Sequence, residues 1–254
     1  MLTILMPAYN EAKTLEHAVG RVVDMQPALG LPLEILIVDD GSADRTIEIG
    51  ERVAAAQSSD QVHIRVLQHG RNRGKGAAVH TGIAASTGDY VVVQDADMEY
   101  DPADLPRLLR PLQEGRADVV FGSRFAGGET HRVLYYWHSI GNRFLTLLSN
   151  MFTNLNLTDM EVGYKMFRGD LLRSLRLVET DFGFEPEVTA RVAQLRNPRC
   201  RLYEVGISYA GRTYADGKKI TWRDGFRALW CIFRHNIFDR EEPTNRRTGA
   251  GGWG

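Results

Sequence analysis

Short apolar runs alternate with longer amphipathic segments through the first half of the chain. The runs are rich in Val, Ile and Leu and end at polar residues, which predicts buried strands. They lie at Thr3–Met6, Glu34–Val38, His63–Leu67, Tyr90–Gln94 and Asp118–Phe121. Helical patterns separate them at Ala12–Met25, Asp44–Ala56, Lys75–Ser86 and Pro102–Glu114. This alternation predicts an α/β fold in which a mostly parallel, doubly wound sheet has helices on both faces.

The second half of the chain has a different pattern. The segment Arg132–Leu157 combines aromatic and aliphatic residues at helical spacing with little charge. Two shorter strands are predicted near Tyr164–Arg168 and Leu202–Tyr209, on either side of a helix near Glu185–Arg196. A last amphipathic helix is predicted from about Thr221 to Phe238. One domain over residues 1–238 accounts for this pattern, and we expect residues 239–254 to be a disordered tail.

Composition limits the partners of the chain. Hydrophobic residues make up 43% of it and charged residues 25%, which is ordinary for a soluble globular protein. A formal net charge of −1 argues against nucleic acid, so any polyanion must be held by a local cluster of Arg and Lys. Cys200 and Cys231 lack metal-ligand spacing, which predicts free thiols in a reducing compartment. With no secretory signal and no run of 18 apolar residues, we expect a cytoplasmic protein, with peripheral contact to a membrane left open.

An acidic segment, Gln94-Asp95-Ala96-Asp97-Met98-Glu99, follows the fourth predicted strand. Asp95 and Asp97 alternate with Ala96, so both carboxylates can point to one side of an extended chain. Carboxylates packed this closely repel one another unless a cation is present. Mg²⁺ or Mn²⁺ commonly binds one or two carboxylates together with substrate phosphates. The alternative is an acidic turn that caps the helix after Pro102.

Two further polar loops follow the second and third predicted strands. Val38-Asp39-Asp40-Gly41-Ser42-Ala43-Asp44 supplies carboxylates that could accept hydrogen bonds from a ribose or a base, or else forms a turn and a helix N-cap. Asn72-Arg73-Gly74-Lys75-Gly76 precedes a helix, and its glycines, its cations and the helix N-terminus all favour a phosphate. A solvated basic turn is the alternative for this segment.

A fourth polar loop, Pro7-Ala8-Tyr9-Asn10-Glu11, follows the first strand. Its aromatic ring and carboxylate could stack on and hydrogen-bond a nucleobase, and a helix start at Asn10 explains the segment equally well. Ligands of doubly wound sheets bind beyond the carboxyl ends of the strands. We therefore expect the four loops to form one site that supplies base, ribose, phosphate and metal functions.

These four segments resemble the motifs of the family-2 inverting glycosyltransferases with the GT-A fold. Within that family the chain looks most like the dolichyl- and polyprenyl-phosphate mannosyl- and glucosyltransferases. Further support lies in Gly122-Ser123-Arg124, in Asp159 with Gly163-Tyr164-Lys165, and in Tyr209-Ala210-Gly211-Arg212 leading to Gly217-Lys218-Lys219. The resemblance covers roughly residues 1–225. It implies a Rossmann-like sheet in which residues 1–125 bind a nucleotide sugar and residues 126–238 bind the acceptor.

The resemblance also implies an activity and a set of site residues. The activity is transfer of a hexose from a nucleoside-diphosphate sugar, of the GDP-mannose or UDP-glucose type, to a polyprenyl phosphate. The nucleotide-sugar site would comprise Pro7, Ala8, Tyr9, Glu11, Val38, Asp39, Asp40, Arg73, Gly74, Lys75, Asp95 and Ala96. Asp95, Asp97 and Glu99 would hold Mg²⁺ or Mn²⁺, although many relatives carry Gln where Glu99 stands. The catalytic set would be Asp97, Arg124, Arg212 and Lys219, with Lys218-Lys219 in place of the relatives' frequent Ser-Lys pair.

The acceptor decides whether a general base is needed. A phosphate monoester has a second pKa near ~6 and is already a dianionic nucleophile at neutral pH, whereas a sugar hydroxyl must lose a proton. Candidates for holding an acceptor phosphate are Arg124, Arg143 and Arg212. Candidate bases for a hydroxyl are Asp159, Glu185 and Glu187, and the two glutamates could instead be helix N-terminal charges.

Two alternative functions share the donor-side residues. One is a glycosyltransferase that acts on a sugar hydroxyl of a polysaccharide, a glycolipid or a small molecule. The other is a non-catalytic subunit that binds a nucleotide sugar.

An aromatic helical face near the C-terminus raises the question of membrane contact. Its members recur on one side of the predicted helix and are Trp222, Phe226, Leu229, Trp230, Phe233 and Ile237. Arg223, Arg227 and Arg234 flank this face, which is typical of an interfacial membrane helix. A helix packed on the core of its own domain gives the same pattern. The segments Leu134–Trp137 and Phe144–Phe152 form a second candidate surface with the same alternatives.

Overall fold

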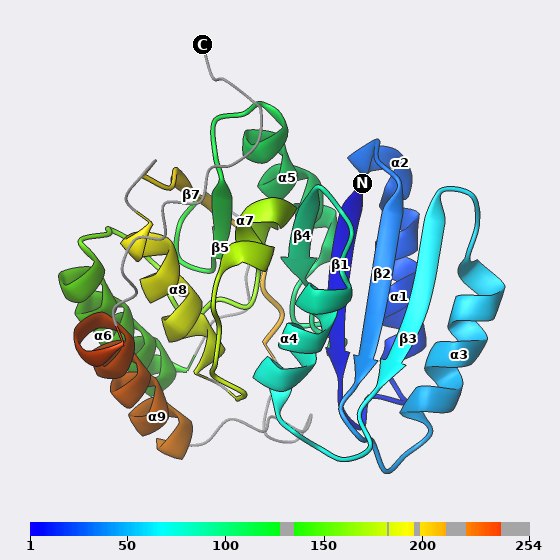
Figure 1. Ribbon diagram of the computed structural model, residues 1–254, viewed down its shortest axis with the longest axis horizontal. Coiled ribbons are helices and arrows are strands. Elements are labelled where there is room, and N and C mark those ends of the chain that lie inside the picture. Colours follow the sequence, from blue (N-terminus) through cyan, green and yellow to red (C-terminus); the bar gives the residue numbers. More distant parts are fainter. Residues whose placement is uncertain (128–134, 182, 196–198, 212–221, 240–254) are drawn as a thin grey trace.

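The computed structural model describes residues 1–127, 135–181, 183–195, 199–211 and 222–239, without the side chains of residues 222–224. Its centre is a seven-stranded sheet with the order β3-β2-β1-β4-β6-β5-β7 (Figure 1). The strands are β1 (Leu2–Ala8), β2 (Leu33–Asp39), β3 (Val62–Gln68), β4 (Tyr90–Val93), β5 (Val119–Ser123), β6 (Lys165–Arg168) and β7 (Leu202–Gly206). Neighbouring strands are parallel except at β6, which is antiparallel to both β4 and β5. The predicted α/β fold with a mostly parallel sheet is confirmed.

The sequence of each strand fits its place in the sheet. Every residue of β2 is buried, as is nearly all of β1, which explains their unbroken apolar runs. At the edge strand β3, Val62 and Ile64 are buried whereas His63 and Arg65 are exposed. The carboxyl ends of the parallel strands carry the polar loops.

Helices cover both faces of the sheet (Figure 1). The helices of the first half are α1 (Leu15–Asp24), α2 (Gln26–Leu29), α3 (Thr46–Gln57), α4 (Lys75–Ala85), the 3₁₀ turn Pro102–Asp104 and α5 (Leu105–Gln113). On one face α4 packs against β1, β2 and α7 (Gly169–Ser174). On the other face α1 packs against α2 and α3, and α2 packs against α5.

Helix α1 begins three residues later than the sequence predicted. The N–H groups of Glu11 and Ala12 donate to Thr46 Oγ1 and Asp44 Oδ2, at 2.9 and 3.2 Å. These long-range bonds hold both residues against the start of α3 and keep them out of α1. Asp44 accepts a hydrogen bond from the N–H of Thr46, the first residue of α3, but the N-cap position is occupied by Arg45, so the predicted cap at Asp44 is wrong by one residue.

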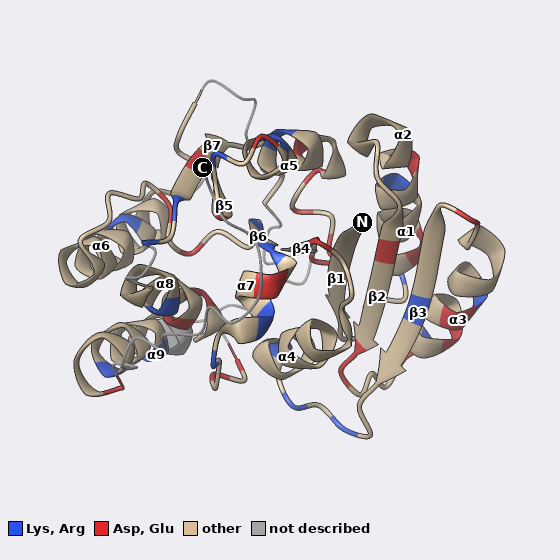
Figure 2. Cartoon of the chain, turned by 45° about the horizontal axis from the view of Figure 1, so that its top comes forward, with Lys and Arg blue, Asp and Glu red and all other residues tan. Residues whose placement is uncertain are grey.

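The remaining helices gather at the end of the sheet away from β3 (Figures 1 and 2). They are α6 (Tyr136–Thr153), α8 (Phe184–Gln194), α9 (Trp222–Phe233) and a π-helical turn, Arg234–Phe238, that continues α9. Both α8 and α9 pack against α6, and α8 packs against α9. Residues 132–134 of one predicted helix and the predicted tail 240–254 lie outside the described residues. Within the described residues, none of the helices has both the length and the apolar character needed to cross a bilayer.

Candidate active site

The polar loops that follow β1, β2, β3 and β4 meet at one edge of the sheet, because these strands are parallel neighbours. Direct contacts join each loop to the next. Asn10 links the first loop to the second, Asp40 links the second to the third, and Lys75 links the third to the acidic loop after β4. The structure therefore brings together the four segments that the sequence predicted as one site.

Asn10 joins the first two loops through both its backbone and its side chain. Its Oδ1 accepts a hydrogen bond from the N–H of Ala43, and its own N–H donates to Ser42 Oγ, both at 2.9 Å. Asn10 adopts a left-handed conformation with φ of 56°, which few residues other than Gly and Asn tolerate. The residue is therefore a brace between the loops, and the alternative of a helix start at Asn10 is wrong. Tyr9 beside it is exposed at this edge of the sheet.

The two adjacent aspartates of the second loop have different roles. The carboxylate of Asp40 accepts hydrogen bonds from the N–H groups of Arg73 and Gly74, and it lies 2.6 Å from His69 Nδ1. Asp39 is completely buried, and its Oδ2 accepts from the N–H of Ser42. The other oxygen of Asp39, Oδ1, is buried without a hydrogen-bond partner. Asp40 therefore shapes the loops, while Asp39 retains an acceptor for a ligand hydroxyl.

Glycines allow the loops to approach each other closely. Gly41 has φ of 70°, and a Cβ there would lie 2.4 Å from the carbonyl carbon of Arg71. Gly74 has φ of 98°, and a Cβ there would lie 2.4 Å from the carbonyl oxygen of Thr180. The basic loop is thus pressed between the aspartate loop and the segment before α8. Arg73 in this loop is exposed.

Lys75, the first residue of α4, faces two carboxylates. Its Nζ lies 2.9 Å from Asp95 Oδ2 and 3.6 Å from Glu185 Oε1. Burial acts to lower the pKa of Lys75, but the two carboxylates raise it above its ordinary value. The ammonium is therefore charged at physiological pH and already neutralises part of the acidic loop.

The acidic loop after β4 is held by several partners. Asp97 Oδ1 accepts from the N–H of Glu99, and Glu99 Oε2 accepts from the Tyr209 hydroxyl at 2.9 Å. Met98 between them has φ of 65°, a conformation that a residue with a side chain keeps only when its surroundings enforce it. Asp95, Asp97 and Glu99 offer the hard oxygen donors that Mg²⁺ and Mn²⁺ prefer. The half-buried carboxylates of Asp95 and Asp97 fit a divalent cation that also binds substrate phosphates.

Among the described residues, the one group of three potential ligands whose ligand atoms lie close together is not in the acidic loop. Glu179, Cys231 and His235 are buried, and their ligand atoms lie within 4.8 Å of one another. Two guanidinium groups already neutralise Glu179, since Arg234 Nη1 lies 3.0 Å and Arg227 Nη2 3.7 Å from its oxygens. Burial and the neighbouring Glu179 also raise the pKa of the Cys231 thiol to about 12. Such a group is better suited to structural hydrogen bonding than to holding a cation.

At the carboxyl end of β5, Arg124 and Asp159 form a buried ion pair. Arg124 Nε and Nη2 each lie 2.7 Å from a different oxygen of Asp159, and Asn142 of α6 also donates to that carboxylate. Burial acts to raise the pKa of Asp159, but the Arg124 guanidinium and these hydrogen bonds hold it below its ordinary value. The guanidinium carbon of Arg143 lies 5.8 Å from the centre of the Phe125 ring beside this pair.

The predicted candidate bases are engaged in other contacts. Asp159 is bound by Arg124, and Glu185 faces Lys75. Glu187 accepts hydrogen bonds from the N–H groups of Val178 and Glu179. Both glutamates lie in the first turn of α8, in agreement with the alternative of helix N-terminal charges.

Glu161 is a half-buried residue of this region that the sequence analysis did not single out. Its Oε1 is buried without a hydrogen-bond partner. Burial, together with the negative charge of Glu185, raises the pKa of Glu161 to about 8. Lys165 nearby donates to the carbonyl oxygen of Met160 at 2.9 Å, and burial lowers its pKa to about 8. The sequence offered one signal for Glu161, which is its position between Asp159 and Gly163, two residues that support the family resemblance.

Two members of the predicted catalytic set, Arg212 and Lys219, lie outside the described residues, as does Lys218. The same holds for the side chains of Trp222 and Arg223. The other predicted site residues are all described and lie on the loops and strand ends given above. Pro7, Ala8 and Val38 are the last residues of β1 and β2, and buried Ala96 separates Asp95 from Asp97.

The chain is similar in sequence to known sugar transferases. Residues 3–176 match the glycosyl transferase family 2. The chain is 33% identical over 227 residues to the undecaprenyl-phosphate mannosyltransferase of Micrococcus luteus, a match that covers 86% of each protein. It is 26% identical over 217 residues to the undecaprenyl-phosphate 4-deoxy-4-formamido-L-arabinose transferase of Yersinia enterocolitica. That match covers 85% of this chain and 62% of the longer relative.

The fold is similar to that of glucosyl-3-phosphoglycerate synthase from Mycobacterium tuberculosis. The structure of that protein with phosphoglyceric acid superposes with a TM-score of 0.68 at 20% identity, covering 93% of this chain and 80% of that chain. A second structure of it, with Mn²⁺, uridine diphosphate and phosphoglyceric acid, also gives 0.68, at 19% identity, covering 93% and 78%. This likeness, together with the strand order, confirms the predicted GT-A fold.

Proposed function

The chain belongs to the glycosyl transferase family 2 and is a glycosyltransferase, and from this premise we propose a specific reaction. The reaction is inverting transfer of a hexose from a nucleoside-diphosphate sugar to a polyprenyl phosphate, assisted by Mg²⁺ or Mn²⁺. The observation that carries the proposal is the similarity to the Micrococcus luteus undecaprenyl-phosphate mannosyltransferase, which extends over nearly the full length of both chains.

The donor would bind at the joined loops. The buried, unpartnered Oδ1 of Asp39 would accept a hydrogen bond from a ribose hydroxyl, and the exposed ring of Tyr9 would stack on the base. The diphosphate would extend toward Arg73 and the N-terminus of α4, which favours negative charge. In support, the Mycobacterium tuberculosis neighbour has been crystallised with uridine diphosphate and uridine-diphosphate-glucose.

Asp97 and Asp95 would hold the divalent cation against the diphosphate, and Glu99 stands at the end of the same loop. When bound, the metal would stabilise the negative charge that develops on the leaving diphosphate. The neighbour's complexes with Mn²⁺ and with Mg²⁺ support both ions as candidates. Lys75 would assist by fixing the position of the Asp95 side chain.

A phosphate acceptor suits the acceptor-side residues. The guanidinium carbons of Arg124 and Arg143 each lie 5.8 Å from the centre of the Phe125 ring, and both cations would attract a phosphate dianion. That nucleophile needs no general base, which agrees with Asp159 being bound by Arg124 and with its lowered pKa. Since a polyprenyl phosphate resides in a bilayer, the enzyme would work in peripheral contact with a membrane.

Transfer to a sugar hydroxyl is the second candidate, because Glu161 favours it. The ionised form of this carboxyl group is a stronger base than an ordinary carboxylate, because its pKa is raised, and its unpartnered oxygen could accept a proton from a hydroxyl. In that case Glu161→Gln would abolish transfer, whereas transfer to a phosphate dianion would persist in the same variant.

The test is to incubate the full chain with labelled GDP-mannose or UDP-glucose and Mn²⁺. The acceptors would be undecaprenyl phosphate in detergent and, separately, free sugars. Labelled lipid with inverted anomeric configuration supports the proposal. Labelled free sugar without labelled lipid would favour the second candidate, which is transfer to a sugar hydroxyl. No transfer to any acceptor would favour a non-catalytic nucleotide-sugar-binding subunit.

A further inference from the structure

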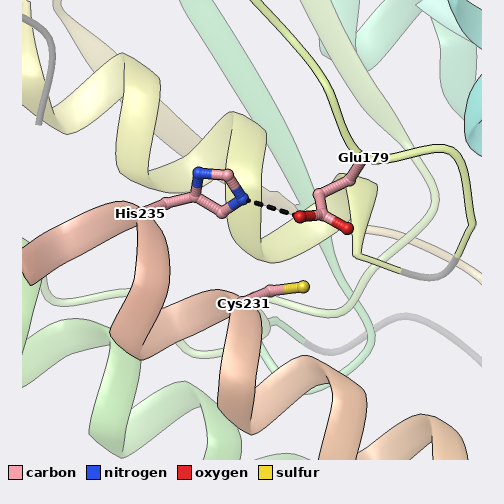
Figure 3. A group of neighbouring side chains, drawn as sticks. All are labelled: Glu179, Cys231 and His235. Atoms are coloured by element: carbon pink, nitrogen blue, oxygen red, sulfur yellow. Dashed lines mark hydrogen bonds and ion pairs between the residues drawn. The ribbon is translucent and has the colours of Figure 1, made fainter. Parts of the chain in front are cut away.

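Helix α9 and the π-helical turn that continues it bury both apolar residues, such as Ile232, and polar ones, and they carry aromatic side chains on their exposed side. On the buried side, His235 Nε2 lies 3.0 Å from Glu179 Oε1, and Cys231 lies beside the same carboxylate (Figure 3). On the exposed side, Phe226 is 66% and Trp230 58% exposed. Phe233, Ile237 and Phe238 extend this face along the π-helical turn. The helix thus packs on the protein through apolar and polar contacts and presents a second, aromatic face outward.

Helix α6 also combines polar side chains on its inner side with exposed apolar side chains on its outer side. Its inner side bears Asn142, Thr146 and Ser149, of which Asn142 donates to Asp159 and Thr146 accepts from the N–H of Met160. Its outer side is apolar, and Trp137 is 79% exposed there. The members of this outer face recur at helical spacing and are Tyr136, Trp137, Ile140, Phe144, Leu147 and Met151.

The outer faces of α6 and α9 adjoin. The two helices pack side by side at the end of the molecule away from β3 (Figures 1 and 2). The rings of Phe152 and Phe233 meet edge to face between the helices, with centroids 5.2 Å apart. We call the exposed apolar residues of the two helices the α6–α9 face. Contiguous apolar surfaces of this kind mark sites of contact with another apolar phase.

We propose that the α6–α9 face docks the protein on a bilayer that contains anionic lipids. The proposal rests on the proposed function, in that a polyprenyl phosphate acceptor lies in such a bilayer. Exposed Trp and Tyr side chains favour the boundary between headgroups and acyl chains. Charge on α6 agrees with an anionic surface, because the helix contains Arg143 and no Asp or Glu (Figure 2).

The position of α6 also connects the docked face to the acceptor-side residues. Asn142 reaches inward to Asp159, while Phe144, two residues later, points to the exposed side of the same helix. Arg124 binds that same Asp159. A lipid whose chain lies under the α6–α9 face could therefore present its phosphate to Arg124 and Arg143 across the width of α6, a distance of ~10 Å.

The test is cosedimentation of the full chain with vesicles that contain no polyprenyl phosphate, so that docking is measured apart from catalysis. The vesicles are phosphatidylcholine alone or phosphatidylcholine with phosphatidylglycerol. The double variant Trp137→Ser/Phe226→Ser removes one exposed aromatic side chain from each helix. The matched control is Tyr203→Ser, which removes an exposed aromatic side chain from β7. Thermal unfolding checks that all the variants fold.

We expect the wild type and Tyr203→Ser to bind the anionic vesicles, and the double variant to bind about tenfold more weakly or worse. A wild-type protein that stays in the supernatant with both kinds of vesicle would overturn the proposal. So would a concentration-dependent dimer that the double variant abolishes without any vesicle binding, because it would assign the face to a second copy of the chain. Vesicle binding without transfer to undecaprenyl phosphate would support the docking role of the α6–α9 face but rule out the proposed acceptor.

Discussion

Lys75 Nζ lies 2.9 Å from Asp95 Oδ2, so the first residue of α4 is joined to the acidic loop after β4. Glu185 of α8 approaches the same ammonium at 3.6 Å. One cation therefore connects the basic loop, the acidic loop and a helix of the second half of the chain. Because the ammonium is mostly buried, the loss of its charge would leave two carboxylates without compensation.

Replacing Lys75 with Met is expected to lower the free energy of unfolding by about 2–4 kcal/mol, because Asp95 and Glu185 lose their cation. Mn²⁺ is expected to raise the unfolding temperature of Lys75→Met more than that of the wild type, since a divalent cation can replace the ammonium beside Asp95. Thermal unfolding with and without Mn²⁺ measures both effects. Lys13→Met, at an exposed position, is the control. Equal Mn²⁺ shifts in wild type and Lys75→Met would contradict the expectation.

Replacing Asp97 with Asn is expected to reduce transfer by about 10²-fold or more while the unfolding temperature stays close to that of the wild type. The amide keeps the shape of the side chain but removes a hard anionic ligand of the proposed metal. Rates with saturating donor and Mn²⁺ measure the effect. Asp89→Asn, at the opposite end of β4 and paired with the N-terminus, is the control. A wild-type rate in Asp97→Asn would rule out the metal role of this carboxylate.

The sequence predicted the elements whose signal is local. The strands β1 and β2 were predicted to within two residues, because the burial of each strand shows in its own continuous run of apolar residues. The start of α1 was missed because Glu11 and Ala12 are bound by residues more than 30 positions away. Contacts of this range leave no periodic signal in the chain.

The candidate site also combines features that the sequence could predict with features that depend on long-range contacts. The loops could be predicted, because polar residues after parallel strands must meet at one edge of the sheet. The different states of Asp39 and Asp40 could not, because they depend on which N–H groups the folded basic loop directs at Asp40. Glu161 was missed for a related reason, since its raised pKa comes from burial and from Glu185, 24 positions along the chain.

Replacing Arg124 with Lys is expected to weaken use of the acceptor more than binding of the donor. Lysine keeps a positive charge toward Asp159 but lacks the planar fork that grips two oxygens at once. The KM for undecaprenyl phosphate should rise about tenfold, while the Kd for the nucleotide changes by less than about twofold. Steady-state kinetics and calorimetry separate the two effects. Arg116→Lys, which pairs with Glu114 on the surface, is the control. An equal weakening of acceptor use and of nucleotide binding would rule out a specific role of Arg124 in acceptor binding.

Replacing Asp159 with Asn is expected to cost about 3–5 kcal/mol at pH 7, because Arg124 would be left buried without its anion. The pKa of Asp159 is lower in the folded protein than in the unfolded chain. As pH falls below about 4, the unfolded chain takes up the proton first, so the stability contributed by Asp159 is progressively lost. The stability gap between wild type and Asp159→Asn should therefore narrow between pH 5 and pH 3, approximately.

Urea unfolding across that range measures the gap. Exposed Asp60→Asn is the control, for which little difference from the wild type is expected at any pH. A gap for Asp159→Asn that stays constant from neutral to acid pH would mean that the ion pair does not stabilise the fold.

Replacing Glu161 with Gln is expected to stabilise the protein at neutral pH. Burial and Glu185 raise the pKa of Glu161 to about 8 from an ordinary value of 4.5. Between those two values the unfolded chain gives up the proton that the folded protein keeps, so rising pH favours unfolding at this position. Glutamine is neutral in both states and escapes this penalty. The gain should be close to zero at about pH 4 and then grow by up to about 1.4 kcal/mol per pH unit, to at most about 4 kcal/mol near pH 7.5. Urea unfolding of both proteins at the two pH values measures it, with exposed Glu51→Gln as the control. If Glu161→Gln were no more stable than the wild type at the higher pH, the carboxyl group would be ionised without cost, and its pKa would not be raised in the folded protein.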